Sequence, residues 1–144
     1  MIGQAGAAVV DSILLPRGIP VMPAPDGRPY DRLALIGDDA ITIQIKTTTH
    51  PTGSGLYGWN ISCGYRNSPR GRRRYGHRAF RLLACVVLPE HAVVFRLPGS
   101  SRVSLRVAEL GVLRRDPLAS FYQCLHEIGL GYLDTDEGDD LPPM

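Results

Sequence analysis

The apolar residues of this chain recur in short runs, separated by polar stretches that carry glycine and proline. The first run, residues 3–15, is rich in small apolar residues and is followed by Pro16, Arg17 and Gly18, which is typical of a helix and its stop signal. Several later runs have the apolar content and turn boundaries of strands. The predicted strands are residues 19–22, 30–36, 40–47, 58–64, 81–88, 92–97 and 103–107.

The spacing of these runs predicts how they connect. Strands 30–36 and 40–47 are separated by Gly37, Asp38 and Asp39, and strands 81–88 and 92–97 by a similarly short turn, so each pair predicts a hairpin. Asp116 followed by Pro117 suits the start of a last helix. The order of helix, strands and helix predicts an α/β domain, with a mixed, largely antiparallel central sheet flanked by an N-terminal and a C-terminal helix.

Composition divides the chain into two parts. The 144 residues suit one domain. All 16 basic residues and nine of the 14 acidic residues precede residue 134, so residues 1–133 carry a net charge of +7 and are expected to form the domain. Residues 134–144 form an acidic tail that is expected to be disordered. A basic domain favours a polyanionic partner.

Nothing in the sequence suggests secretion or membrane insertion. The N-terminal apolar stretch lacks a basic leader, and no segment approaches the ~20 apolar residues of a membrane span. Cys63, Cys85 and Cys124 are far apart and lack the paired spacing of zinc sites or disulfide frameworks. We therefore expect a cytoplasmic protein with reduced cysteines.

The strand around residues 41–46 carries the chemistry. Its period of two places three isoleucines on one face and Thr42, Gln44 and Lys46, the only lysine of the chain, on the other. If the hairpin turns about Asp38 and Asp39, register counting places Asp31 opposite Lys46. Asp31, Gln44 and Lys46 would then converge.

These three side chains suit phosphodiester hydrolysis. A carboxylate, an amide oxygen and a backbone carbonyl are hard oxygen ligands of the kind that Mg²⁺ accepts, with Mn²⁺ as a second candidate. Such an ion lowers the pKa of an attacking water, and a lysine beside it can neutralise charge on the phosphate. The alternative is an edge strand with a polar outer face and no catalytic role.

These residues also carry a family resemblance. Pro29, Tyr30 and Asp31, followed by Gln44, Ile45 and Lys46 in the next strand, resemble the PD-(D/E)xK signature of restriction-endonuclease-like nucleases. The pattern is most similar to the small homing-endonuclease-like and Holliday-junction-resolvase-like branch, in which glutamine replaces the second acid to give QxK. The resemblance spans roughly residues 3–98. It implies Asp31 and Gln44 as metal ligands and Lys46 as the catalytic lysine.

The first helix departs from this family. Many members place a metal-binding glutamate there, whereas the first glutamate of this chain is Glu90. Asp11 is the candidate substitute, and Gln4, two helical turns away on the same face, is a weaker one. Asp31 would otherwise be the only close carboxylate.

A second functional segment is rich in arginine and aromatic residues. Arginine makes bidentate phosphate contacts, and neighbouring aromatic rings can pack on sugars or unpaired bases. We expect this segment to bind DNA; a solvated loop, or a loop paired with the acidic tail, is the alternative. The predicted nucleic-acid-binding residues are Arg66, Arg70, Arg72, Arg73, Arg74 and Arg78.

Three functions compete at this point. The first is a magnesium-dependent DNA endonuclease, which by analogy would act as a homodimer or homotetramer because one small domain cannot easily cut both strands. The second is a degenerate nuclease-fold protein that binds DNA or a protein partner without cutting. The third is an unrelated α/β interaction module in which Lys46 has no catalytic role.

Overall fold

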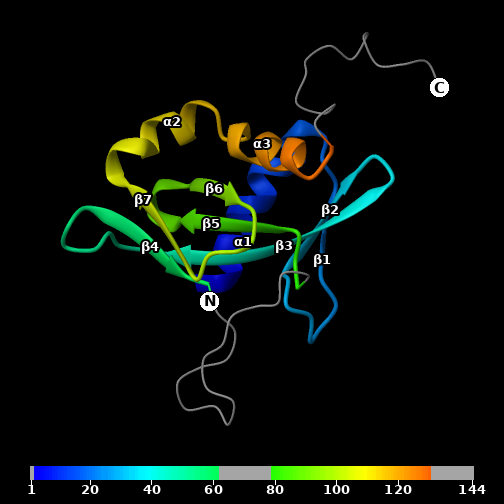
Figure 1. Cartoon of the computed structure of the whole chain (residues 1–144), viewed down its shortest axis with the longest axis horizontal. Coiled ribbons are helices and arrows are strands. Elements are labelled where there is room, and N and C mark those ends of the chain that lie inside the picture. The colour runs from blue at the N-terminus through cyan, green and yellow to red at the C-terminus, as the bar shows by residue number, and fades with distance from the viewer. Residues whose placement is uncertain (1, 62–78, 131–144) are drawn as a thin grey trace.

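The computed structural model describes residues 2–61 and 79–130 (Figure 1). None of the helices in these ranges is long and apolar enough to cross a membrane. The α-helices are α1 (Ile2–Leu14), α2 (Leu110–Arg115) and α3 (Ala119–Glu127). The strands are β1 (Val21–Pro23), β2 (Arg32–Ile36), β3 (Asp39–Thr48), β4 (Leu56–Asn60), β5 (Leu82–Val87), β6 (Ala92–Arg96) and β7 (Arg102–Arg106), and short 3-10 helices cover Leu15–Arg17, Leu88–Glu90 and Val107–Glu109.

The central sheet has five strands in the order β1-β2-β3-β5-β6. Only the pairing of β3 with β5 is parallel, and the other three pairings are antiparallel. The helix α1 starts the described chain and α3 ends it, as the sequence predicts. The predicted mixed α/β class, with a largely antiparallel central sheet and helices at both ends, is confirmed.

The register of the first hairpin differs from the prediction. Ile36 pairs with Asp39 and Leu35 with Ala40, so the turn consists of Gly37 and Asp38. Gly37 adopts a φ of 60°, which suits the first central position of a type II′ turn, where glycine is strongly favoured. The predicted pairing of Asp31 with Lys46 is therefore wrong by two residues, and Gln44 takes the place opposite Asp31. A shift of two leaves every side chain on its predicted face.

The two faces of the central sheet have different covers (Figure 1). On one face, α1 and α3 pack on the isoleucines of β3 and on Phe95 and Phe121, whose rings meet edge to face at 5.1 Å. On the other face, β4, β7 and α2 enclose a second cluster around Trp59, Leu83 and Cys85. We call this second face the site face, because alternation along β3 places Gln44 and Lys46 on it.

Two predictions about the C-terminal half need correction. The strand predicted at residues 103–107 forms as β7, but it pairs with β4 in a separate two-stranded sheet and does not join the central sheet. The short helix α2 was not predicted. The last helix begins at Ala119, three residues after the predicted cap Asp116, and Gly129 follows its end with a φ of 94°.

Helix α1 lies close against β3 at Gly6. A Cβ atom at this position would collide with the side chain of Thr47, whereas the space around Gly3 is open. Thr47 lies on the helix face, and its buried hydroxyl oxygen has no hydrogen-bond partner. Glycine thus lets the helix rest directly on the strand that carries the candidate site.

Candidate active site on strand β3

Asp31 lies beside Gln44 at the start of β2. Its backbone N–H donates to the carbonyl oxygen of Ile43 at 2.8 Å, and its carboxylate oxygen Oδ2 accepts a hydrogen bond from the backbone N–H of Ile45, also at 2.8 Å. These two bonds reach β3 on either side of Gln44. The structure therefore brings Asp31 and Gln44 together, with Lys46 two residues further along the same face of β3.

Gln44 is unusual among the residues of the sheet. It is 8% exposed and is the only buried polar residue in the described ranges. No side-chain hydrogen bond within those ranges holds its amide group. The one fully buried, unpartnered side-chain polar atom of the described ranges is the hydroxyl oxygen of Thr47, so the amide of Gln44 keeps contact with solvent and can reach a ligand there. The position of Gln44 beside a carboxylate therefore suggests a binding role.

Lys46 is half-buried and pairs with Cys85 on β5. Burial raises the pKa of the Cys85 thiol to about 12, and the positive charges of Arg96 and Lys46 oppose this rise. Both cations are thus close enough to act on the same thiol. The thiol stays protonated at neutral pH, so it is not a nucleophile. Lys46 and Arg96 therefore add positive charge to the site face.

The oxygen atoms at Asp31 and Gln44 fit a hard divalent cation. Within the described ranges, Asp31 Oδ1 accepts no hydrogen bond, while Oδ2 is held by Ile45. The amide oxygen of Gln44 and the backbone carbonyl of Ile45 are neutral donors of the type that Mg²⁺ and Mn²⁺ accept. The described residues contain no group of three or more His, Cys, Asp or Glu side chains suited to a metal. A cation here would therefore keep much of its water.

Asp11 takes part in a different interaction. Arg32 donates to it through Nε at 3.0 Å and through a second guanidinium nitrogen at 3.2 Å. Arg32 also donates to the backbone carbonyl of Asp31 at 3.1 Å. Asp11 is thus linked to the site through Arg32, and its role as a metal ligand stays a prediction. Gln4, the weaker candidate, is exposed on α1.

Sequence reasoning missed the contribution of Thr42. Its hydroxyl oxygen accepts a hydrogen bond from the backbone N–H of Arg81 at 2.8 Å, and its carbonyl oxygen accepts from the same group at 3.1 Å. These two bonds fix the point at which the chain re-enters the sheet as β5, beside β3. The predicted DNA-binding arginines, residues 66–78, lie outside the described residues.

The described residues on either side of that arginine segment lie on the site face. Ile61 precedes it and Phe80 follows it, and both are buried in the cluster on the site face. The backbone N–H of Ile61 donates to Ser101 at 2.8 Å. Ile61 and Phe80 therefore both belong to the face that carries Gln44.

The chain was compared with known proteins. No family model and no curated protein matches the sequence. A solved structure, the bacterial homing endonuclease I-Ssp6803I, matches with a TM-score of 0.63 over 82% of this chain and 95% of that chain. The fold is similar to that of a homing endonuclease. The sequence identity is 16%, so the likeness concerns the fold. The PD-(D/E)xK motif in its QxK form stays a prediction.

Proposed function

We propose that this protein is a DNA endonuclease that hydrolyses phosphodiester bonds with Mg²⁺ or Mn²⁺. The observation that carries the proposal is the position of Gln44, a largely buried residue whose amide has no side-chain partner in the described ranges and lies directly beside the carboxylate of Asp31. The fold it shares with a bacterial homing endonuclease supports the same conclusion.

Each residue has a distinct part in this proposal. Asp31 is held by the backbone of Ile45, so it can present its other oxygen to a cation without losing its position. Gln44 adds a neutral oxygen from the strand. A magnesium ion held by these oxygen atoms would supply a water of lowered pKa and would polarise the phosphate. Lys46 lies two residues further along the same face, where its ammonium can orient the water or neutralise the charge that develops on the phosphate.

DNA would be held by the arginine segment. The six arginines at positions 66–78 supply phosphate contacts that are independent of base sequence. Ile61 and Phe80, the buried residues on either side of this part of the chain, both pack on the site face. We propose a homodimer or homotetramer, since cutting both strands needs two such sites.

Cleavage tests this proposal directly. A panel of duplex, junction and single-stranded DNAs is incubated with Mg²⁺ or Mn²⁺ and with wild type, Asp31→Asn, Gln44→Leu or Lys46→Ala. We expect metal-dependent cleavage by wild type and a large loss in each variant. Asp26→Asn is the control, because Asp26 is an exposed acid that forms no side-chain hydrogen bond in the described ranges. Cleavage that persists in all three site variants would reject the site.

One observation favours a second function, a nuclease-fold protein that binds DNA without cutting it. Arg32 engages both oxygens of Asp11, so Asp31 is the one carboxylate of the described residues that lies at Gln44. A single carboxylate binds magnesium weakly. DNA binding without cleavage of any substrate in the panel would support this function.

A further inference from the structure

The β4–β7 sheet has one buried face and one exposed face. Alternate residues of both strands pack into the cluster on the site face, and these are Tyr57, Trp59, Val103 and Leu105. The residues between them point the other way. On this outer face, Asn60, Arg102, Ser104 and Arg106 are all exposed. Within the described ranges, the β4–β7 sheet therefore presents a polar surface to solvent.

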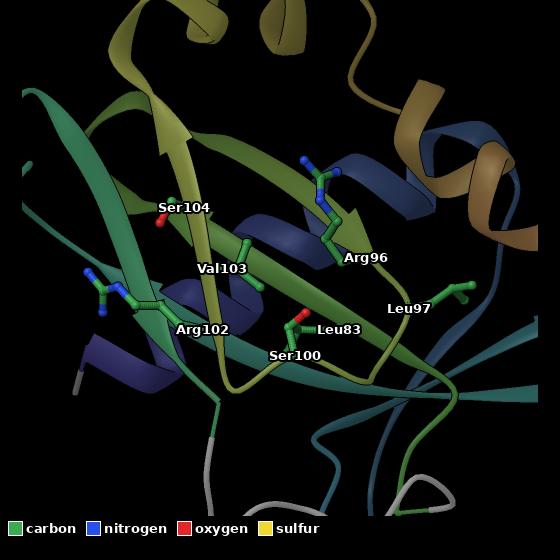
Figure 2. Close-up of a pocket in the computed structure, with 7 residues that line it drawn as sticks. All are labelled: Leu83, Arg96, Leu97, Ser100, Arg102, Val103 and Ser104. Carbon is green, nitrogen blue, oxygen red and sulfur yellow. The ribbon is translucent and has the colours of Figure 1, made fainter.

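Arg102 is held in place on the outer face by β4. One of its guanidinium nitrogens donates to the side-chain oxygen of Asn60 at 2.9 Å. The guanidinium group lies over Gly58, where a Cβ atom would collide with it, and Figure 2 shows the side chain extending from β7 toward β4. No ion pair of the described ranges includes Arg102, and its acceptor is neutral. Its charge and its remaining N–H groups are therefore available to an external acceptor.

The rest of the outer face adds a second cation and further polar groups. The guanidinium group of Arg106 is 4.0 Å from the carboxylate of Glu109, which also accepts the backbone N–H of Arg106 at 2.8 Å. The Arg106 side chain is 77% exposed, and an exposed pair at this distance is weak. Ser104 supplies a hydroxyl group between the two arginines. The face thus suits a polyanion that also carries hydrogen-bond acceptors.

The dimensions of this face fit the major groove of DNA. The groove is about 12 Å wide and admits a two-stranded sheet. Alternate residues of a strand are about 6.8 Å apart, and two base-pair steps of about 3.4 Å span the same distance. Arg102, Ser104 and Arg106 can therefore meet base edges at intervals of two steps. Arginine donates to both major-groove acceptors of guanine, and the bond to Asn60 fixes the guanidinium plane that such a directional contact requires.

One end of the β4–β7 sheet lies next to the candidate active site. Arg102 and Val103 line a pocket of about 210 Å³ together with Leu83 of β5 (Figure 2). Leu83 is 1% exposed beneath the β4–β7 sheet and pairs with Gln44 on β3. This end of the β4–β7 sheet is therefore one strand away from Gln44. On the far side of Gln44, Asp31 is exposed, so that side of the site stays open.

The step between the two sheets is similar to the depth of the major groove. Stacked sheets lie about 10 Å apart, and the groove is about 8.5 Å deep. With the outer face against the base edges, the phosphates at the rim of the groove extend back beside the β4–β7 sheet, toward the central sheet. Asp31 is exposed on that level. One duplex can therefore contact the outer face and the candidate site together, without passing over the covered residue Leu83.

We propose that the outer face of the β4–β7 sheet lies in the major groove of DNA, where Arg102, held over Gly58 by Asn60, contacts a guanine. The inference rests on the function proposed above, because it takes DNA as the ligand. It adds a preference for base sequence, which phosphate contacts alone do not provide.

The test measures base preference separately from cleavage. Binding sites are selected from a random duplex library in EDTA with wild type, Arg102→Gln and Arg17→Gln. We expect wild type to enrich a guanine at one position by roughly tenfold or more, and Arg102→Gln to lose this preference at that position alone. Arg17→Gln is the matched control, because it removes the same charge at Tyr122 on the helix face. Thermal denaturation of every variant checks the fold.

A second measurement locates the contact in the groove. Methylation of guanine at N7 blocks its major-groove acceptor, so it should weaken binding of wild type at the selected guanine and have no further effect on Arg102→Gln, since both changes remove the same contact. Gly58→Ala displaces the guanidinium group without removing a charge. We expect it to lose the same guanine preference and to keep the salt dependence of wild type.

The outcomes separate this inference from the proposed endonuclease. Retention of the guanine preference in Arg102→Gln or Gly58→Ala, or binding by wild type without any base preference, would overturn the major-groove contact even if the enzyme cleaves DNA. A loss of affinity in Arg102→Gln that is equal for all sequences would identify a phosphate contact and would also overturn it. Loss of the guanine preference without cleavage by wild type would retain the contact and reject the endonuclease. Absence of DNA binding by wild type would reject both.

Discussion

Asp31 combines a structural and a chemical role, and two substitutions separate them. Its carboxylate oxygen accepts the backbone N–H of Ile45 at 2.8 Å. Asp31→Asn retains an oxygen that can accept this bond but removes the charge, whereas Asp31→Ala removes both. We therefore expect both variants to lose metal-dependent cleavage, and Asp31→Ala to lose more stability than Asp31→Asn.

The size of the stability effect follows from the bond. A hydrogen bond to a charged acceptor contributes about 1.5–3 kcal/mol and a neutral one about 0.5–1.5 kcal/mol, so Asp31→Asn should cost about 1 kcal/mol. Asp31→Ala leaves the Ile45 donor unpaired, which costs about 1–3 kcal/mol. Because Asp31 is exposed, water can replace part of either bond, which lowers both values but leaves Asp31→Ala the more destabilising of the two.

Urea denaturation in metal-free buffer measures the difference between the two variants, and the cleavage assay measures the loss of charge. Asp26→Asn and Asp26→Ala are the control pair, for which we expect equal stability. Equal free energies of unfolding for Asp31→Asn and Asp31→Ala would refute the structural role of the bond. Cleavage by Asp31→Asn at the wild-type rate and the wild-type Mg²⁺ requirement would refute the chemical role.

Three further predictions concern other parts of the fold. Gly6→Ala should destabilise the protein by about 1–3 kcal/mol in urea denaturation, because the added Cβ atom collides with Thr47 of β3. Gly3→Ala, which adds its Cβ atom in open space, should raise the free energy of unfolding by about 0.5–1 kcal/mol. Equal effects of the two variants would contradict the close helix contact. The pKa of the Cys85 thiol is raised from 9.0 to about 12, so the folded state holds the thiol proton more tightly than the unfolded state does. The stability that this difference contributes is present below pH 9 and is lost as the pH rises toward 12. Cys85→Ala should therefore lose less stability over this range, and an unchanged loss would refute the burial effect. Asp11→Asn and Arg32→Gln should each lower the free energy of unfolding by up to about 1 kcal/mol, and the two losses should not add in the double variant, because both break the same ion pair. A tenfold higher Mg²⁺ requirement for cleavage in Asp11→Asn alone would instead identify Asp11 as a metal ligand.

Much of the candidate site could be predicted from sequence because it depends on local alternation. The period of two along β3 places Gln44 and Lys46 on one face whatever the partner strand is. The pairing of Asp31 depends on the turn: moving the turn by one residue shifts the pairing by two, which preserves the same pattern of faces. The conformation of Gly37 decides between them, and composition alone does not specify it.

The β4–β7 sheet shows the limit of such reasoning. Alternation identifies β7 as a strand, but the same pattern suits the edge of a five-stranded sheet and a separate two-stranded sheet. The short helix α2 has six residues with Gly111 as its second, so its formation depends on burial of Leu110 and Leu113 against the site face. Such packing is not visible in a local window.

The single parallel pairing, between β3 and β5, affects the order in which the protein folds. The β2–β3 hairpin joins neighbouring segments and contains Asp31, Gln44 and Lys46, so it can form on a timescale of about 1–10 μs. The parallel pairing joins Thr42 to Arg81, which are 39 positions apart, and must first close that long loop. The proposed catalytic residues can therefore assemble early in one local unit, whereas the row of paired residues from Gln44 through Leu83 to Arg96 exists only after the slow, long-range step.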